Sequence, residues 1–187
     1  SKSFQSVITS LPDAEETNMN LETWQKWFVD CVSQIVAKSK DYAIFYQTDR
    51  KANGTWLSKA NLVFKGIENA GAKLVWHKIV LRRQPGMIDL FRPGFTHLIC
   101  ASKNGKCGKA TPDVFERGSM IYDNAMGLNA VRTSLEFIKA NCISVEITDP
   151  FFGRGTILAA ANKTGFDSVG VDIAPEQCKK AETLKFK

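Results

Sequence analysis

A string of glycines and acidic residues has the residue types and spacing of a nucleotide-binding turn. It runs from Asp149 through Gly153 and Gly155 to Thr156. Glycines let the backbone turn sharply and approach a ligand closely, and a helix that begins there points its free amide groups at that ligand. Asp172 follows about 20 residues after the first glycine, where a carboxylate can bind both hydroxyls of a ribose. These residues predict a site for a ligand that contains a ribose.

Two other interpretations of the turn are less favoured. A nicotinamide or flavin cofactor requires a third glycine, and position 158 is Leu158 instead. A tight turn between a strand and a helix, without any ligand, is the simplest alternative. The length of the string from Asp149 to Thr156 and the position of Asp172 after the second strand weigh against a turn without a ligand.

Secondary structure must position this turn, and the sequence supplies it. Residues 143–147 read as a strand, 157–163 as a helix and 168–172 as a second strand, which together form a βαβ unit. Apolar patterns elsewhere predict strands at 6–9, 42–46, 73–81 and 95–100, and helices at 21–38, 57–67, 128–138 and from Pro175 onward. The alternation of strands and helices predicts an α/β fold with a mainly parallel sheet, helices on both faces and an antiparallel pair formed by 73–81 and 95–100.

The composition describes one domain, residues 1–187. The chain is 44% hydrophobic and 24% charged, so it can bury a core and is not disordered. No run approaches the roughly 20 apolar residues of a membrane span, and residues 1–4 lack the apolar core of a signal peptide. We therefore expect a soluble intracellular protein of the cytoplasm or nucleus.

The cysteines predict neither disulfides nor a metal site. There are five, an odd number, with no C-x-x-C pair. His97, Cys100 and Cys107 are three potential zinc ligands, but no fourth ligand follows at finger spacing, and a free cysteine is commonly a small buried side chain. We expect no metal.

The string Asp149-Pro150-Phe151-x-Gly153-x-Gly155-Thr156, followed by Gly170-Val171-Asp172, closely resembles the AdoMet-binding motif of the class I DNA and RNA amino-methyltransferases. The resemblance implies a Rossmann-like three-layer sandwich and S-adenosyl-L-methionine (AdoMet) as cofactor. It also implies a role for each matching residue. The aspartate and glycines line the amino-acid end of AdoMet, the phenylalanine packs beside it, and the acid after the second strand binds the ribose: Asp149, Phe151, Gly153, Gly155, Thr156 and Asp172.

The catalytic loop of that family carries Asp, Asn or Ser, then two prolines and an aromatic residue, at the end of a strand. Here Ser10-Leu11-Pro12-Asp13 is the candidate. Methylating an exocyclic amine requires localising a lone pair that is delocalised into the ring, so acceptors must face the amine hydrogens. Leu11 replaces the first proline and Asp13 replaces the aromatic residue. Either the target is held differently, or the usual reaction has been lost.

The Ser10 loop precedes the glycine string, which reverses the order of ordinary class I enzymes. This order resembles that of the circularly permuted β-type amino-methyltransferases. The resemblance implies a catalytic half at 1–100 and an AdoMet-binding half at 120–187, in which Asn124 and Gly127 contact the methionine part. Between them, the glycines, lysines and Pro112 of 101–119 predict a mobile loop. Because the sequence ends near the helix that starts at Pro175, we expect six core strands in place of seven. The 168–172 strand would then lie at an edge, covered by a partner subunit such as a second copy or left open by truncation.

The net charge of +6 suggests a polyanionic partner. Basic residues gather at Lys78 and Arg92 and at five candidate nucleic-acid contacts, Arg82, Arg83, Lys103, Lys106 and Lys109, although a solvated lysine-rich surface explains them equally well. Residues 101–119 are too few for a separate recognition domain, which favours structured RNA over a fixed DNA site.

Three functions follow, in order of preference. The first is AdoMet-dependent N-methylation of a base in RNA or DNA. The second is a catalytically silent protein of this fold that binds nucleic acid or a partner, and the third is a methyltransferase for small molecules or proteins.

Overall fold

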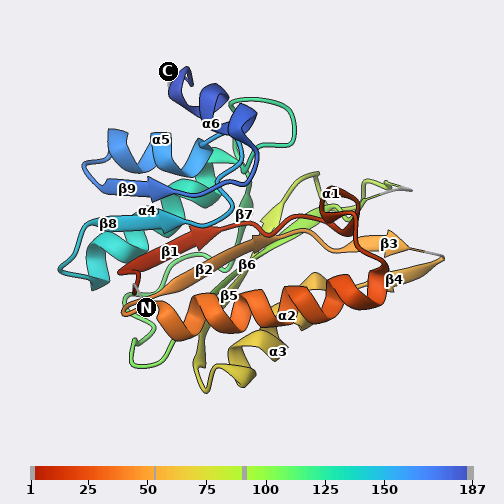
Figure 1. Ribbon diagram of the computed structural model, residues 1–187, viewed down its shortest axis with the longest axis horizontal. Coiled ribbons are helices and arrows are strands. Elements are labelled where there is room, and N and C mark those ends of the chain that lie inside the picture. Colours follow the sequence, from red (N-terminus) through yellow and green to blue (C-terminus); the bar gives the residue numbers. More distant parts are fainter. Residues whose placement is uncertain (1–2, 53, 90–91, 185–187) are drawn as a thin grey trace.

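The computed structural model describes residues 3–52, 54–89 and 92–184, and a central sheet flanked by helices dominates it (Figure 1). The strands of this sheet are β1 (Ser6–Thr9), β2 (Ala43–Gln47), β5 (Lys73–Leu81), β6 (Phe95–Ser102), β7 (Val114–Glu116), β8 (Glu146–Asp149) and β9 (Asp167–Gly170). A separate hairpin joins β3 (Arg50–Ala52) to β4 (Thr55–Leu57). The helices are α1 (Ala14–Thr17), α2 (Leu21–Lys38), α3 (Lys59–Asn69), α4 (Leu128–Asn141), α5 (Thr156–Lys163) and α6 (Pro175–Glu182).

The sheet is mainly parallel, as the alternation of elements predicts. Within the described ranges its strand order is β7-β5-β6-β2-β1-β8-β9. β6 alone runs against its neighbours, and it pairs antiparallel with both β5 and β2. The predicted antiparallel pair is therefore confirmed. The strands β1, β2, β5 and β8 all run in one direction, so their carboxyl ends lie at the same end of the sheet.

The sheet has one strand more than the six that the sequence predicts. The additional strand, β7, lies in the segment 101–119, for which the composition predicts a loop. It is three residues long, too short to give a periodic signal, and it forms by pairing parallel to β5 at Ile79, Val80 and Leu81. The strand before Asp172 lies at the opposite edge of the described sheet, as predicted.

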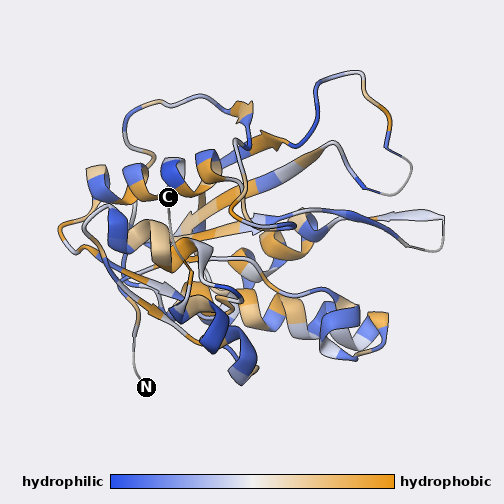
Figure 2. Ribbon diagram, turned by 90° about the horizontal axis from the view of Figure 1, so that it is seen from above, coloured by the Kyte–Doolittle hydropathy of each residue, from blue (hydrophilic) through white to orange (hydrophobic). Residues whose placement is uncertain are grey.

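Helices cover both faces of the sheet and complete three layers. Side chains from α2 and α3 pack under one face, and those from α4 and α5 pack over the other. Asn20 caps α2 by accepting a hydrogen bond from the Thr23 amide, and this helix buries Trp24, Phe28 and Val32. Figure 2 shows hydrophobic and hydrophilic residues alternating along the helices, as amphipathic packing requires. None of the helices in the described ranges is long and apolar enough to cross a membrane.

The predicted limits of the βαβ unit shift by a few residues. The strand expected at 143–147 begins only at Glu146, and Ile143 and Val145 are exposed. The next strand ends at Gly170, so Asp172 belongs to the loop that follows it. In the sequence, apolar β-branched residues continue the pattern beyond each observed strand. In the structure, each strand covers only the residues that pair between β8 and β9. Pro175 begins α6, as predicted.

Candidate active site

A cleft of about 730 Å³ opens where the carboxyl ends of β1, β2 and β8 meet. Its walls come from segments that are far apart in the sequence: the Ser10 loop, the end of β2, the start of α3, the residues ahead of α4, and the glycine turn. Of the residues predicted as catalytic or cofactor-binding, the cleft is lined by Ser10, Leu11, Asp13, Asn124, Asp149, Phe151, Gly153 and Thr156. The fold therefore brings the two predicted motifs to one site.

Asp149 joins the two motifs at the base of the cleft. It ends β8, it is buried, and its Oδ1 accepts hydrogen bonds from Thr9 Oγ1 at 2.6 Å and from the Phe151 amide at 3.1 Å. Thr9 is the residue before Ser10, so this contact ties the end of β1 to the glycine turn. Burial raises the pKa of Asp149 to about 7, with a smaller increase from Asp172, despite the two hydrogen bonds that favour ionisation.

The glycine turn has the backbone that only glycine adopts readily. Gly153 and Gly155 have φ of 53° and 82°, and a side chain on Gly153 would project into open space. The Gly153 amide donates to Asp172 Oδ2 at 3.0 Å, and the Ala174 amide donates to Oδ1 at 2.9 Å. The turn thus fixes the Asp172 carboxylate, although Asp172 is not among the residues that line the cleft.

The turn and the segment ahead of α4 contact each other through polar and aromatic groups. Thr156 Oγ1 donates to the Tyr122 hydroxyl at 3.0 Å, and the Arg154 guanidinium lies 4.0 Å from the centre of the Tyr122 ring. Asn124 lines the cleft and accepts a hydrogen bond from Arg92 at 3.0 Å.

Two of the predicted glycines pack against protein and do not line the cleft. A Cβ on Gly127 would lie 2.2 Å from the Arg117 carbonyl oxygen, so this glycine permits close packing of the backbone. A Cβ on Gly155 would lie 2.9 Å from the Cβ of Ala181 in α6.

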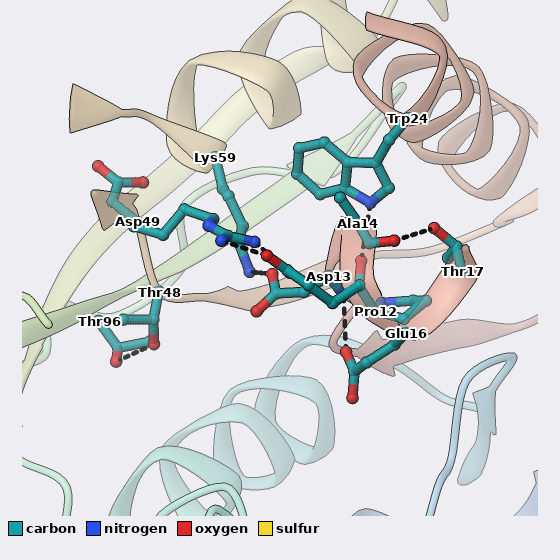
Figure 3. Close-up of polar contacts among 12 residues, drawn as sticks. Pro12, Asp13, Ala14, Glu16, Thr17, Trp24, Thr48, Asp49, Lys59 and Thr96 are labelled. Atoms are coloured by element: carbon teal, nitrogen blue, oxygen red, sulfur yellow. Dashed lines mark hydrogen bonds and ion pairs between the residues drawn. The ribbon is translucent and has the colours of Figure 1, made fainter. Parts of the chain in front are cut away.

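The Ser10 loop is anchored on the side of α2 and α3. Leu11 is buried in the core, and the Pro12 carbonyl accepts a hydrogen bond from the Trp24 indole at 3.1 Å. Asp13 is the N-cap of α1, and its carboxylate forms an ion pair with Lys59 at the start of α3 (Figure 3). Ser10 remains exposed on the cleft wall.

The five basic residues predicted to bind nucleic acid do not lie together. Arg82 lines the cleft, whereas Arg83 forms an ion pair with Asp89. Because β6 runs antiparallel to β2, it carries the chain away from the cleft: Ala101 pairs with Ala43, at the amino end of β2. Lys103 and Lys106 follow at that far end, where the Lys106 carbonyl accepts from Tyr42, and Lys109 follows Gly108, which lies against Asn141 at the end of α4.

Two more arginines line the cleft with Arg82: Arg92, which belongs to the predicted basic cluster, and Arg117, which the sequence did not single out. Burial lowers the pKa of Arg82, and the positive charges of Arg92 and Arg117 act in the same direction. Lys78 is unsuited to a phosphate contact because it is buried and bonded to the Thr111 and Pro112 carbonyls and to Asp113.

A buried pair of an acid and a histidine lies beside the cleft, and no sequence pattern indicates it. Asp49 lines the cleft, and its Oδ2 lies 3.2 Å from His97 Nε2, while His97 Nδ1 lies 2.9 Å from His77 Nε2. Burial favours the neutral acid, but the contacts from His97, Trp56 and the Ala60 amide outweigh it and lower the pKa of Asp49 to about 2. Asp49 lies in the loop after β2, His77 in β5 and His97 in β6, so no local spacing connects them.

This arrangement also argues against the zinc set considered from the sequence. His97 faces Asp49 and His77, whereas Cys100 stands three residues along the same strand and packs in the core on the other face. Among the described residues, no group of three or more His, Cys, Asp or Glu side chains is placed to hold a metal ion.

Comparison with solved structures identifies the fold. A candidate DNA modification methylase from Thermus thermophilus superimposes with a TM-score of 0.70 at 16% identity, covering 96% of this chain and 84% of that one. The PvuII DNA methyltransferase, which is cytosine-N4-specific, gives 0.70 at 14% identity over 100% and 80%. The complex of M1.HpyAVI with SAM gives 0.63 at 12% identity over 97% and 88%.

No protein-family model matches the sequence, and no curated protein matches it significantly. The chain nevertheless has the methyltransferase fold of these structures, which the sequence predicts.

Proposed function

We propose that this protein is an AdoMet-dependent methyltransferase that N-methylates an exocyclic amine of a nucleic-acid base. The observation that carries the proposal is the junction of β1 and β8, where the hydrogen bond from Thr9 to Asp149 holds the Ser10 loop and the glycine turn at one cleft. Structures with this fold include a cytosine-N4-specific DNA methyltransferase and a complex with SAM, which support the same class of reaction.

The residues around the glycine turn fit AdoMet. Open space at Gly153 lets a ligand approach the backbone. Asp149 offers a carboxyl group to the positively charged amino-acid end, and Asp172 keeps free lone pairs on a carboxylate already oriented by the turn. When bound, AdoMet supplies an electrophilic methyl group. By resemblance Phe151, Gly155, Thr156, Asn124 and Gly127 complete the site, with Gly155 and Gly127 acting through backbone packing.

Loss of the Asp172 carboxylate tests this assignment. A charge-assisted hydrogen bond to a ribose hydroxyl contributes about 1.5 to 3 kcal/mol. Asp172→Ala should therefore weaken AdoMet binding roughly tenfold or more by calorimetry. Unchanged affinity would remove Asp172 from the site.

Ser10 is the residue that we propose to receive the target amine. Its hydroxyl lies on the cleft wall and has no hydrogen-bond partner among the described residues, so it is free to accept from an amine N–H. Leu11 in the core and the Pro12 carbonyl on Trp24 hold the loop in place. An acceptor fixed in this way helps to localise the amine lone pair for attack on a methyl group.

DNA is the first substrate to test, and RNA is the second. Two of the similar structures are named as DNA methylases, whereas the short segment 101–119 in the sequence favours RNA. We propose Arg82, with Arg92 and Arg117, as the contact to backbone phosphates at the cleft. The permuted order of the two motifs also remains part of the proposal.

Methyl transfer from labelled AdoMet onto DNA, RNA and protein of the source cell tests the function. We expect label in nucleic acid, and Ser10→Ala should lower kcat roughly a hundredfold while AdoMet affinity stays unchanged. Ser33→Ala, in α2 and outside the cleft, is the matched control. Label in protein alone, or full activity of Ser10→Ala, contradicts the proposal.

One observation favours the second candidate, a silent protein of this fold. Asp13 stands where the family has a base-stacking aromatic residue, and Lys59 neutralises it. A thermal shift with AdoMet but no transfer to any polymer would support that alternative. Asp13→Tyr would then be the informative variant, because a stacking ring restores what the loop lacks.

A further inference from the structure

Gln47, the last residue of β2, has a buried side-chain amide without hydrogen bonds. Its side chain lines the cleft, yet the residue is only 1% exposed. Neither Oε1 nor Nε2 has a partner among the described residues. Buried polar groups are nearly always paired, because an unmet donor or acceptor loses its hydration without compensation. Gln47 therefore lacks two hydrogen bonds that the fold itself does not supply.

The other buried polar residues of the cleft within the described ranges have the partners given above: Asp49, Lys59, Asp149 and Thr156. Gln177 also lines the cleft with an unpaired Oε1, but this residue is partly exposed. Gln47 is thus the exception among the buried residues of the site, which distinguishes it from a generally loose or polar wall.

The neighbours of Gln47 hold its backbone in place. Thr48 Oγ1 and Thr96 Oγ1 lie 2.7 Å apart (Figure 3). The Asp49 carboxylate accepts a hydrogen bond from the Ala60 amide at the start of α3. Gln47 itself pairs with His97 on β6. Because the backbone is held on both sides, the amide is presented at a fixed place in the cleft, which lowers the entropic cost of binding a ligand.

Gln47 also stands next to the candidate catalytic loop. β1 and β2 are parallel neighbours with Thr9 paired to Phe45, so Gln47 lies just beyond the end of β1, beside Ser10 and Leu11. Ser10 and Gln47 both line the cleft, so a ligand bound there can contact the Ser10 hydroxyl and the Gln47 amide together.

An amide presents one acceptor and one donor side by side, and its complement is an amine beside a ring-nitrogen acceptor. Adenine and cytosine present this edge on their base-pairing face, where guanine instead carries its amine beside an N–H donor, and paired glutamine contacts to adenine are a common means of base recognition. Thymine and uracil have a carbonyl group in place of the amine. We propose that Gln47 binds the amine edge of the target base, adenine or cytosine, accepting from the amine through Oε1 and donating to the ring nitrogen through Nε2. This rests on the proposed function.

In this contact Gln47 and Ser10 bind different hydrogens of the target amine. An exocyclic amine has two hydrogens, and Gln47 takes the one nearer the ring nitrogen while Ser10 takes the other. Both acceptors then lie at the amine, and the lone pair is left unbonded. Gln47 thereby selects the base, and Ser10 acts on the reacting group.

Gln47→Leu tests the proposal, because leucine keeps the approximate volume and removes both polar atoms. We expect the variant to fold with unchanged or higher stability in urea, since an unpaired buried amide is lost. AdoMet affinity should stay the same, and kcat/KM on DNA or RNA should fall roughly tenfold to hundredfold. Gln84→Leu, at an exposed position outside the cleft, is the control for the same substitution.

Substrate analogues sharpen the assignment. Replacing the target base by its deaza form, in which carbon replaces the ring nitrogen beside the amine, should slow the wild type but not slow Gln47→Leu further. Separate oligonucleotides with adenine or cytosine as the only amino base distinguish the two bases. The proposal is overturned if the variant and the analogue reduce the rate independently of each other, or if Gln47→Leu has wild-type kinetics. Either result indicates that the Gln47 amide bonds to water only.

A binding measurement separates this proposal from the function on which it rests. If the wild type methylates no nucleic acid, the proposed function fails, and titration with deoxyadenosine, deoxycytidine and thymidine by NMR still tests Gln47. The base-binding role is supported if deoxyadenosine or deoxycytidine binds, thymidine does not, and Gln47→Leu removes the binding. Equal binding of thymidine, or no binding at all, overturns it.

Discussion

At the scale of single residues, Asp149 links the stability of the fold to its proposed chemistry. Burial raises the pKa of this carboxyl from 3.8 to about 7, whereas in the unfolded chain it has its ordinary value. Between about pH 4 and pH 7 the folded state therefore holds a proton that the unfolded state has lost. The free energy of unfolding should decrease as pH rises through this window and become level above it.

Asp149→Asn isolates this contribution, because the asparagine oxygen can still accept from Thr9 and Phe151. Urea unfolding at pH 5 and pH 7.5 should show a smaller loss of stability with rising pH in the variant than in the wild type. An identical pH dependence of the two proteins would mean that Asp149 is ionised throughout.

Binding of AdoMet should release the proton that the Asp149 carboxyl group holds. If the cationic end of AdoMet contacts Asp149, binding favours the ionised form, and affinity should rise with pH up to about 7. Calorimetry in two buffers with different ionisation enthalpies measures the released proton. Asp149→Asn should release none, which distinguishes this residue from other titrating groups.

The sequence predicted the glycine string more completely than the rest of the site. The string is local, so spacing alone reveals it. Gln47, Asp49 and His97 reach the site from β2, the loop after it and β6, and only the strand pairing places them together. Burial and missing hydrogen bonds are properties of the folded chain, so no pattern in the sequence marks Gln47.

At the scale of elements, segments with a clear apolar pattern were predicted, whereas the three-residue strand β7 was not. The helix at Leu21–Lys38 and the strand at Ser6–Thr9 have the predicted bounds. β7, with three residues, exists because β5 offers it a partner. Lys103 follows a strand that was predicted correctly, but the end of the sheet at which it lies depends on the direction of β6.

The contact between α2 and α3 depends on a glycine. A Cβ on Gly66 would lie 2.5 Å from Val32 Cγ1 and 2.9 Å from the Val29 carbonyl oxygen. Gly66→Ala gains about 1 kcal/mol of helix propensity, but overpacking of this kind costs about 1 to 3 kcal/mol, so we expect net destabilisation in urea.

Two further variants check this cause. Gly94→Ala, where a Cβ meets open space, should change stability little. Adding Val32→Ala to Gly66→Ala should recover part of the loss, because the new methyl group then enters the space that the valine leaves. Strictly additive losses would show that the helices are not in contact at this point.

At the scale of the whole molecule, the two edges of the described sheet differ. β7 at one edge is short, whereas β9 at the other is followed by a run of exposed apolar side chains. Val169 lies in β9, and Val171 and Ile173 lie in the loop that follows it; each of the three is more than half exposed. An open parallel edge with apolar side chains favours pairing with another chain.

We therefore expect concentration-dependent self-association through β9. In sedimentation velocity the wild type should shift toward larger species as its concentration rises, and a double variant, Val169→Lys with Val171→Lys, should remain monomeric because lysines at an edge oppose strand pairing. Ile88→Lys is the control, since Ile88 is 86% exposed but lies in the connection between β5 and β6. A wild type that stays monomeric at all concentrations, or a control that dissociates as fully as the double variant, would show that the edge is protected by some other means.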